Sequence, residues 1–292
     1  MNFIKLFFRK YFVEVSPVKR VISILVFLFI FVVAGIGIVY AITSMTVTDS
    51  YNDSTKIASA VNVTVDTVNG RIFLSTASAW SCGSTLLDTR DGKSYATVLI
   101  GSQCWMQQNL NIGTMITGTS NQGVSTTSIQ KYCYANNEAN CNTLGGLYQW
   151  DQAMGGSVTE SARGICPTGW HVPTHNEFTL LERTTCTSGT CAADFPYDSV
   201  TTGWRGTNEG TTLKNVAGLF RGLLVGNRET NGTFANTGTN GNFWSSLQSS
   251  ASAWYRGLAS GYAAVYRGTY AEAYGFSLRC LKDFCIKNKK NG

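Results

Sequence analysis

An uninterrupted run of uncharged, mostly apolar residues covers positions 21–42. As a helix, about 20 such residues cross the hydrocarbon core of a bilayer. The preceding flank is basic, with Glu14 set against Lys5, Arg9, Lys10, Lys19 and Arg20, and such a bias keeps a short flank in the cytoplasm. The pattern predicts a cytoplasmic basic flank over 1–20, a transmembrane helix over 21–42 and a single-pass cell-membrane protein with an extracellular C-terminal domain.

A cleavable signal peptide is the alternative to a retained anchor, because Val39-Tyr40-Ala41 offers small residues near a cleavage point. The apolar run is longer than the roughly 7–15 residues usual for the central region of a signal peptide. We therefore favour retention of the anchor.

Alternating β-branched and polar residues follow, over 61–66 (VNVTVD) and 71–74 (RIFL). This period-two pattern is typical of short strands. The surrounding segment 43–79 is rich in Ser and Thr, and so few residues would give only a marginal core of their own. We expect a β stalk or a small β segment there.

Beyond residue 80 the chain is rich in Gly, Trp and Tyr, and turn dipeptides recur at Asp91-Gly92, Asn231-Gly232 and Asn240-Gly241. Hairpins and ordered loops are therefore expected to dominate this part of the chain.

Two helices are expected within it. The first covers 175–183, because Thr174 can cap it and Glu177, three residues later, completes a capping box. Phe178 and Leu181 would then face the core. The second is shorter and covers 147–154, where Gly155-Gly156 ends it.

The formal net charge of +6 comes mostly from the basic flank before Val21. The remainder is nearly balanced, and its lysine cluster forms a solvated basic tail over 286–292, with Lys287, Lys289 and Lys290. Nucleic-acid-binding domains gather Lys and Arg in a patch or stripe. We therefore expect no nucleic-acid partner.

All nine cysteines lie beyond the apolar run: Cys82, Cys104, Cys133, Cys141, Cys166, Cys186, Cys191, Cys280 and Cys285. This placement suits an oxidising compartment. Cys133/Cys141 and Cys186/Cys191 would each close a small loop, but connectivity stays open and an odd count leaves one thiol over. The sequence has neither paired C-x-x-C motifs nor His-containing clusters, so no metal site is expected.

Several ordered motifs carry a family resemblance. They are DGKSYATVLIGSQCWM over 91–106, QNLN over 108–111, KYCY over 131–134, GGLYQW over 145–150, GICPTGWHVP over 164–173, FWSS over 243–246 and GFSLRCL over 275–281. In wording and order they resemble the Fibrobacter succinogenes major paralogous domain, and the resemblance covers 83–283.

This resemblance implies an α+β domain over 80–285, with a fold similar to that of C-type lectins and formylglycine-generating enzymes. Such a fold has twisted antiparallel sheets, few helices and long loops. The resemblance also implies a disulfide between Cys166, before the main helix, and Cys280, on the closing strand. We expect eight bonded cysteines in all: Cys82, Cys104, Cys133, Cys141, Cys166, Cys186, Cys191 and Cys280.

Segment 254–274, WYRGLASGYAAVYRGTYAEAY, interleaves tyrosines with Gly, Ala and Ser. Tyrosine supplies large amphipathic contact area at low rotamer cost, and small neighbours leave adaptability. We expect a ligand-contact surface formed by Trp254, Tyr255, Arg256, Gly257, Ala259, Ser260, Tyr262, Tyr266, Arg267, Tyr270 and Tyr274. The alternative is that these are ordinary strand-and-turn positions with tyrosines half buried on a sheet face.

Family members are commonly rich in asparagine in this segment. Here a set of positions holds residues whose codons can arise from an asparagine codon by replacement of its adenines; we call them the asparagine-related positions, and they are Gly257, Ala259, Ser260, Tyr262, Ala263, Tyr266, Gly268, Thr269, Tyr270, Ala271 and Tyr274. The pattern resembles the variable region of proteins diversified by retroelements, which display changeable contact residues on a C-type-lectin-like scaffold.

These observations predict a cell-surface binding protein, receptor or adhesin-like, for an extracellular protein or glycan. A structural surface-layer or stalk component without a specific ligand is the alternative, favoured by Ser/Thr-rich stretches and frequent turns. An oxidase-like enzyme is less favoured, because only His171 and His175 could serve as bases and no cysteine pair has an active-site context. The usual signatures of calcium-dependent sugar binding are absent, and we expect neither catalytic residues nor a cofactor.

Overall fold

The computed structural model describes residues 45–47, 61–66, 71–76 and 80–283. The chain divides into two compact units, one of residues 1–80 with 287–292 and the other of 81–286. In the first unit, an antiparallel sheet has the order β1-β2-β3, with β1 (Met45–Val47), β2 (Val61–Asp66) and β3 (Arg71–Thr76). Both β2 and β3 lie where the period-two pattern predicts strands.

The membrane predictions are corrected by the structure. Among the described residues, no helix has the length and apolar character needed to cross a bilayer. The longest described helix has 11 residues, about half of what a bilayer requires. The run 21–42 and its flank lie outside the described residues. The fold class with a preceding transmembrane helix and the single-pass cell-membrane location are therefore wrong as stated, and the described chain is instead sheet-rich with several sheets.

The largest sheet of the second unit has six strands in the order β10-β18-β15-β16-β17-β12. They are β10 (Leu147–Tyr148), β18 (Phe276–Ser277), β15 (Asn240–Ser249), β16 (Ser252–Ala259), β17 (Val265–Ala271) and β12 (Gly203–Arg205). All neighbours are antiparallel except β15 and β18, which are parallel. Consecutive hairpins thus join β15, β16 and β17.

The smaller sheets complete this unit. A four-stranded sheet has the order β11-β19-β7-β6, with β11 (Trp170–His171), β19 (Leu281–Lys282), β7 (Gln103–Met106) and β6 (Thr97–Ile100). Three two-stranded sheets pair β4 (Leu86–Asp88) with β5 (Lys93–Tyr95), β8 (Thr114–Met115) with β9 (Gln130–Lys131), and β13 (Asn227–Arg228) with β14 (Phe234–Ala235).

Turn prediction succeeded at Asn231-Gly232, in the turn between β13 and β14, and at a second dipeptide, but failed at a third. Asp91-Gly92 joins β4 to β5 as predicted. By contrast, Asn240-Gly241 begins β15, because these two residues pair with Ala259 and Leu258 of β16. Pairing across a hairpin here overrides the local turn preference.

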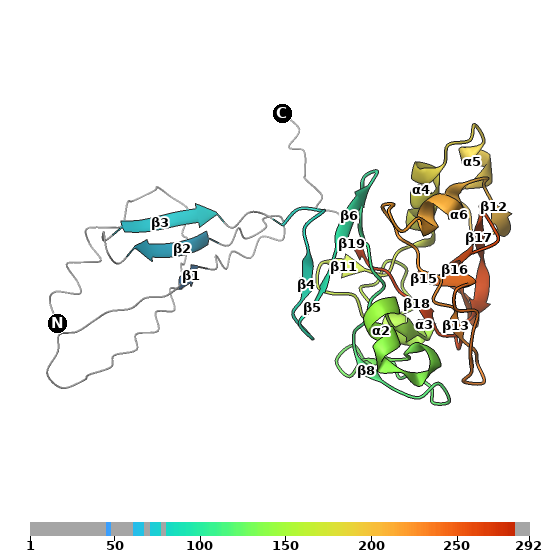
Figure 1. Ribbon diagram of the computed structural model, residues 1–292, viewed down its shortest axis with the longest axis horizontal. Coiled ribbons are helices and arrows are strands. Elements are labelled where there is room, and N and C mark those ends of the chain that lie inside the picture. Colours follow the sequence, from blue (N-terminus) through green and yellow to red (C-terminus); the bar gives the residue numbers. More distant parts are fainter. Residues whose placement is uncertain (1–44, 48–60, 67–70, 77–79, 284–292) are drawn as a thin grey trace, which may run out of the picture. The chain divides into compact units, whose positions relative to one another are not determined.

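The helices are short: η1 (Tyr134–Asn136), α2 (Glu138–Leu144), α3 (Trp150–Met154), α4 (His175–Thr185), α5 (Cys191–Asp194) and α6 (Glu209–Lys214). Figure 1 shows α4, α5 and α6 grouped at one end of the second unit and α2 and α3 at the other. The helix predicted over 147–154 begins only at Trp150, because Leu147 and Tyr148 pair with β18.

The capping prediction for α4 is confirmed. Thr174 Oγ1 accepts a hydrogen bond from the Glu177 N–H at 3.0 Å, and Glu177 Oε2 accepts one from the Thr174 N–H at 2.8 Å. Two backbone donors at the helix start are thereby satisfied reciprocally. Phe178 and Leu181 are buried, as the helical period requires.

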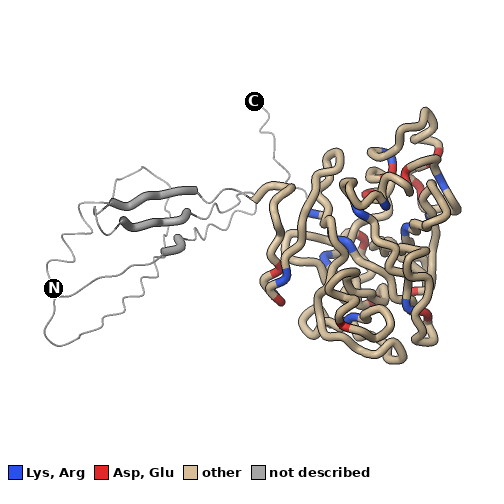
Figure 2. Tube along the Cα trace, viewed as in Figure 1, with Lys and Arg blue, Asp and Glu red and all other residues tan. Residues whose placement is uncertain are grey.

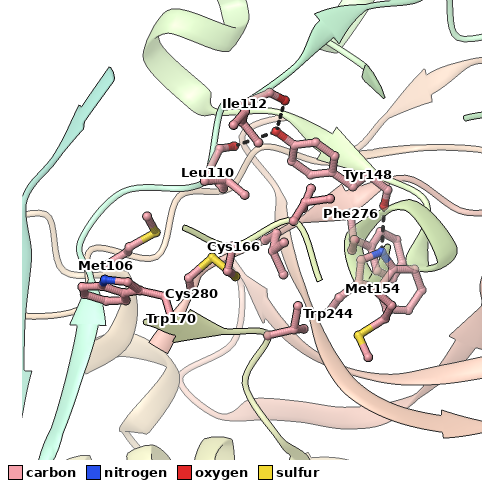
Figure 3. Packing of buried hydrophobic residues seen from close by; sticks show 14 of the residues in the cluster. Met106, Leu110, Ile112, Tyr148, Met154, Cys166, Trp170, Trp244, Phe276 and Cys280 are labelled. Atoms are coloured by element: carbon pink, nitrogen blue, oxygen red, sulfur yellow. Dashed lines mark hydrogen bonds between the residues drawn. A yellow bond between two sulfur atoms is a disulfide. The ribbon is translucent and has the colours of Figure 1, made fainter. Parts of the chain in front are cut away.

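The six-stranded sheet has a hydrophobic core on each face, because successive side chains of a strand point to opposite sides. On one face Trp244, Tyr255 and Phe276 pack with Tyr148 and other buried residues (Figure 3). There the Trp244 indole N–H donates to the Tyr148 carbonyl oxygen at 2.8 Å, so its polar atom is satisfied inside the core. On the other face Phe243, Leu258 and Val265 pack against α4.

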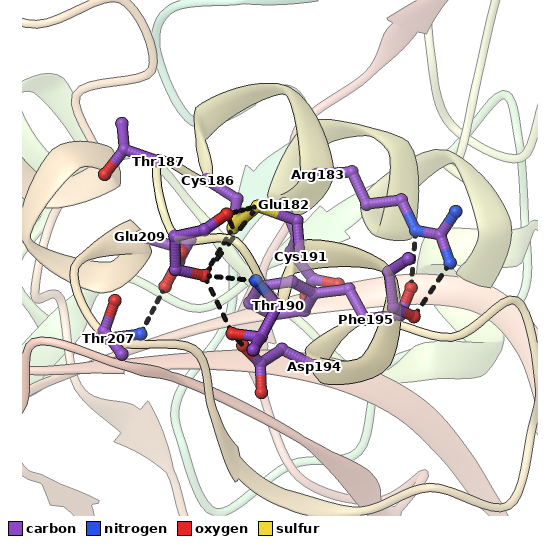
Figure 4. Close-up of a disulfide and its surroundings, with 12 residues drawn as sticks. Glu182, Arg183, Cys186, Thr187, Thr190, Cys191, Asp194, Phe195, Thr207 and Glu209 are labelled. Carbon is purple, nitrogen blue, oxygen red and sulfur yellow. Dashed lines mark hydrogen bonds between the residues drawn. A yellow bond between two sulfur atoms is a disulfide. The ribbon is translucent and has the colours of Figure 1, made fainter.

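Disulfide bonding is confirmed in four pairs: Cys82–Cys104, Cys133–Cys141, Cys166–Cys280 and Cys186–Cys191. Cys166–Cys280 spans 114 residues and lies within the core of Figure 3, whereas Cys186–Cys191 spans 5 and follows α4 (Figure 4). Cys285 lies outside the described residues. Four bonds in one unit suit the oxidising compartment predicted from cysteine placement.

Candidate functional site

The hairpin of β16 and β17 separates segment 254–274 into two sets of side chains. Tyr255 pairs with Gly268, Gly257 with Tyr266 and Ala253 with Tyr270, so these residues share one face of the sheet. Arg256 pairs with Arg267 and both belong to the opposite face. Neighbouring residues of the segment therefore have different surroundings.

A group of aromatic side chains lies on and next to this first face of the sheet. We call this group the aromatic surface; it consists of Trp204, Tyr262, Tyr266, Tyr270 and Tyr274. Trp204, Tyr262 and Tyr270 are 38%, 51% and 40% exposed, and the other two are half-buried. Trp204 lies parallel to Tyr262, with ring centroids 4.0 Å apart. Tyr270 and Tyr274 meet edge to face at 4.4 Å. Both arrangements are favourable for aromatic pairs.

Tyr255 connects the two ends of this surface from below. Its ring lies 5.8 Å from Tyr266, 5.7 Å from Tyr270 and 5.2 Å from Phe276 in the core. Burial is the main reason why the pKa of Tyr255 is raised above its usual value. The neighbouring Tyr266 and Tyr270 raise this pKa further. Tyr266 and Tyr270 therefore rest on a buried aromatic support, whereas Tyr262 lies between β16 and β17 and stacks on Trp204.

Two glycines make room for Tyr266. A Cβ atom at Gly268 would lie 2.8 Å from Tyr266 Cε1, and one at Gly257 would lie 3.1 Å from Tyr266 Cβ. Larger side chains at these positions would force the ring to move. The small residues of the segment thus have a packing role beneath the tyrosine.

On the opposite face, Arg256 and Arg267 are buried rather than exposed. Arg256 Nε donates to Glu182 Oε1 in a buried ion pair, and Arg267 Nη2 donates to His175 Nε2 at 2.7 Å. Burial lowers the pKa of His175 to about 3, with the neighbouring Arg256 and Arg267 adding to the effect, so the ring is neutral. These two arginines belong to the packing of α4 on the sheet and not to the aromatic surface.

The remaining predicted contact residues divide in the same way. Trp254 is buried and meets His175 edge to face at 4.4 Å, whereas Ala259 is half-buried and Ser260 is exposed next to the hairpin turn. Sequence reasoning missed Trp204, which belongs to β12 and pairs with Tyr266. Its separation of about sixty residues from Tyr266 left no local signal.

His171, the other histidine, lines a separate cavity of about 320 Å³ with Ser161, Arg163, Trp170, Glu177 and Asp283. Its Nδ1 lies 2.7 Å from Asp283 Oδ1 and its Nε2 lies 2.9 Å from Glu177 Oε2. Burial alone would lower the pKa of His171, but Glu177 and Asp283 outweigh burial and raise it. Figure 2 shows that acidic and basic residues are interspersed throughout the second unit.

The His171 arrangement predicts a pH-dependent stability. Because its pKa is raised on folding, its stabilising contribution is complete below the ordinary histidine pKa, about 6.5, and is lost as pH rises through the folded-state value. We expect the free energy of unfolding to fall by more between about pH 6 and pH 9 in the native protein than in His171→Gln. Urea titrations at several pH values measure this difference. If the free energy of unfolding depended on pH in the same way in both proteins, the assignment would be contradicted.

A disulfide-bonded, sheet-rich domain with an exposed aromatic surface over buried framework residues is the class of protein that this fold and site define. The model of the Fibrobacter succinogenes major domain family matches residues 98–282, which is more than half of the chain, and the chain belongs to this family. No curated protein and no solved structure matches it. The likeness to C-type lectins and formylglycine-generating enzymes stays a prediction.

Proposed function

We propose that this protein binds a protein ligand through the aromatic surface. The supporting observation is how segment 254–274 divides between buried and exposed residues. Its fully buried side chains, apart from glycine, all lie outside the asparagine-related positions: Trp254, Tyr255, Arg256, Leu258, Val265 and Arg267. Among the asparagine-related positions only Gly257 and Gly268 are buried. Exposed asparagine-related positions over a buried framework of other residues suit ligand recognition.

The composition of the surface favours a protein ligand over other classes. Tyrosine and tryptophan dominate the energetics of protein interfaces, because they bury a large area with few rotatable bonds. Trp204 and Tyr262 are already ordered by mutual stacking, so little side-chain entropy is lost on binding. Diversification of the asparagine-related positions by a retroelement is part of this proposal, and a neighbouring reverse transcriptase with a template repeat would support it.

Binding rather than catalysis is supported by the state of the histidines. His175 is neutral and enclosed by two arginines, and both ring nitrogens of His171 face carboxylates. In both cases the partners of the ring nitrogens are groups of the protein itself, which is the arrangement expected of structural histidines.

The test compares the full-length protein with the double variant Tyr262→Ser/Tyr270→Ser. Each is used to capture cell-surface proteins. We expect the affinity of a captured protein, measured with the purified pair, to fall at least tenfold in the double variant, since aromatic anchors each contribute more than about 1 kcal/mol. Tyr197→Ser is the matched control, because Tyr197 is 50% exposed but lies outside the aromatic surface.

Three outcomes would overturn the proposal. Equal affinity of the double variant and the native protein would exclude the aromatic surface. Unfolding of the double variant, when Tyr197→Ser is stable, would mean that the tyrosines are structural. Self-association without any captured protein would favour the surface-layer alternative.

A further inference from the structure

A second cavity, of about 290 Å³, lies between β5, segment 108–111 and α2. It shares no residue with the aromatic surface. Its lining has a buried floor and an exposed polar rim: the floor includes Tyr95, Asn109, Asn111 and Gly145, and the rim includes Ser94, Gln108, Asn142 and Thr143.

The floor is held rigidly by hydrogen bonds to distant parts of the chain. Asn109 donates to the Leu144 carbonyl oxygen at 2.9 Å and accepts from Arg279 Nε at 2.9 Å. Asn111 Oδ1 accepts from the buried Lys131 Nζ at 2.7 Å. A Cβ atom at Gly145 would lie 2.4 Å from Asn109 Cβ, so only glycine allows this close approach.

The wall formed by α2 is fixed as well. The Cys133–Cys141 disulfide ties this helix to the strand region before it, and Asn142 follows Cys141 directly. A cavity with fixed walls binds a small ligand without an ordering cost. The cavity is therefore shaped before any ligand arrives.

The chemistry of the lining restricts the ligand to a neutral, hydrogen-bonding molecule. Among the described residues, no carboxylate lines the cavity, which disfavours a metal ion or an ammonium group. Lys93, the one cation among the described residues of the lining, is paired with Asp91 at 2.7 Å, which disfavours an anion. Tyr95 is buried and accepts a hydrogen bond from the Asn111 N–H at 3.0 Å, so it offers no open ring face to a nucleobase.

Side-chain amides both donate and accept hydrogen bonds, which suits the adjacent hydroxyl groups of a sugar. Gln108 Oε1 accepts a hydrogen bond from the Ala96 N–H at 2.7 Å, which holds this side chain at the exposed rim of the cavity. Leu144 and Leu223 supply an apolar wall for the C–H groups of a sugar ring. We propose that this cavity binds one sugar residue of a glycan through the side-chain amides of Gln108 and Asn142.

The test uses amide chemical shifts of the full-length protein, titrated with the methyl glycosides of glucose, galactose, mannose and N-acetylglucosamine. We expect at least one glycoside to shift the side-chain amides of Gln108 and Asn142. Asn142→Ala should weaken its binding about tenfold, the effect of one lost hydrogen bond. Asn121→Ala is the matched control, because Asn121 is exposed and does not line the cavity.

Three results would overturn the inference. The first is the absence of shifts at the cavity with all four glycosides. The second is binding of N-acetylglycine methylamide, a neutral amide without hydroxyl groups, in preference to every glycoside. The third is a set of shifts confined to the aromatic surface, which would place glycan binding there and leave the cavity without this role.

Discussion

Replacing Arg256 with alanine is expected to lower the free energy of unfolding by about 3–5 kcal/mol, because the variant leaves a buried carboxylate without its partner. Glu182 is fully buried, and burial raises its pKa even though Arg256 and Arg267 oppose the effect. Removing Arg256 takes away its direct ion-pair partner. The loss should therefore appear in stability and not as a selective loss of ligand binding.

Chemical denaturation of Arg256→Ala measures this loss. Arg163→Ala is the control, since Arg163 is exposed, and surface changes usually stay within about 0.5 kcal/mol. In a double-mutant cycle, Glu182→Gln/Arg256→Met should be much less destabilised than the sum of its single changes. A loss below about 1 kcal/mol in Arg256→Ala would show that the pair is not needed for folding.

Removal of the Cys166–Cys280 bond by a double alanine variant is expected to lower the free energy of unfolding by about 4–5 kcal/mol. The bond closes a loop of 114 residues, so its loss frees the unfolded chain far more than loss of a short loop does. Both cysteines are also fully buried in the core of Figure 3, and their sulfur atoms would leave unfilled space.

The Cys186–Cys191 pair provides the matched comparison. It closes a loop of 5 residues, for which the same chain-entropy relation gives about 2 kcal/mol. Denaturation of the two double alanine variants under identical conditions should therefore separate them clearly. Equal losses, or a larger loss for the short loop, would contradict the loop-length argument.

The surroundings of the short Cys186–Cys191 bond contain two buried carboxylates. Figure 4 shows Glu182, which belongs to α4, and Glu209, the first residue of α6, near Cys186 and Cys191. Glu209 Oε2 accepts from the Thr207 N–H at 2.8 Å, which anchors the start of α6. The disulfide closes the short loop between the end of α4 and the start of α5.

Local sequence determined those features whose partners are close along the chain. The capping box of α4 needs only Thr174 and Glu177, and the strand character of β2 and β3 follows from alternation within each short segment. The motif order identified the family correctly. The prediction of a membrane-crossing helix was wrong as stated, because no described helix is long and apolar enough to cross a bilayer.

The candidate site, by contrast, depends on partners that are far apart along the chain. Alternation along β17 places Tyr266 and Tyr270 on one face and Arg267 on the other, but it does not say which face is covered. That depends on α4, whose residues 175–185 come far earlier in the chain and bury both arginines against Glu182 and His175.

The sequence by itself determined the family, the bonded cysteines, the main helix and the tyrosine-rich composition of segment 254–274. Only the tertiary structure decided that Tyr262 and Tyr270 are exposed, that Arg256 and Arg267 are buried, and that Trp204 completes the aromatic surface by pairing β12 with β17. The physical reason is that the covering of a sheet face is set by elements distant in sequence, and strand periodicity carries no information about them.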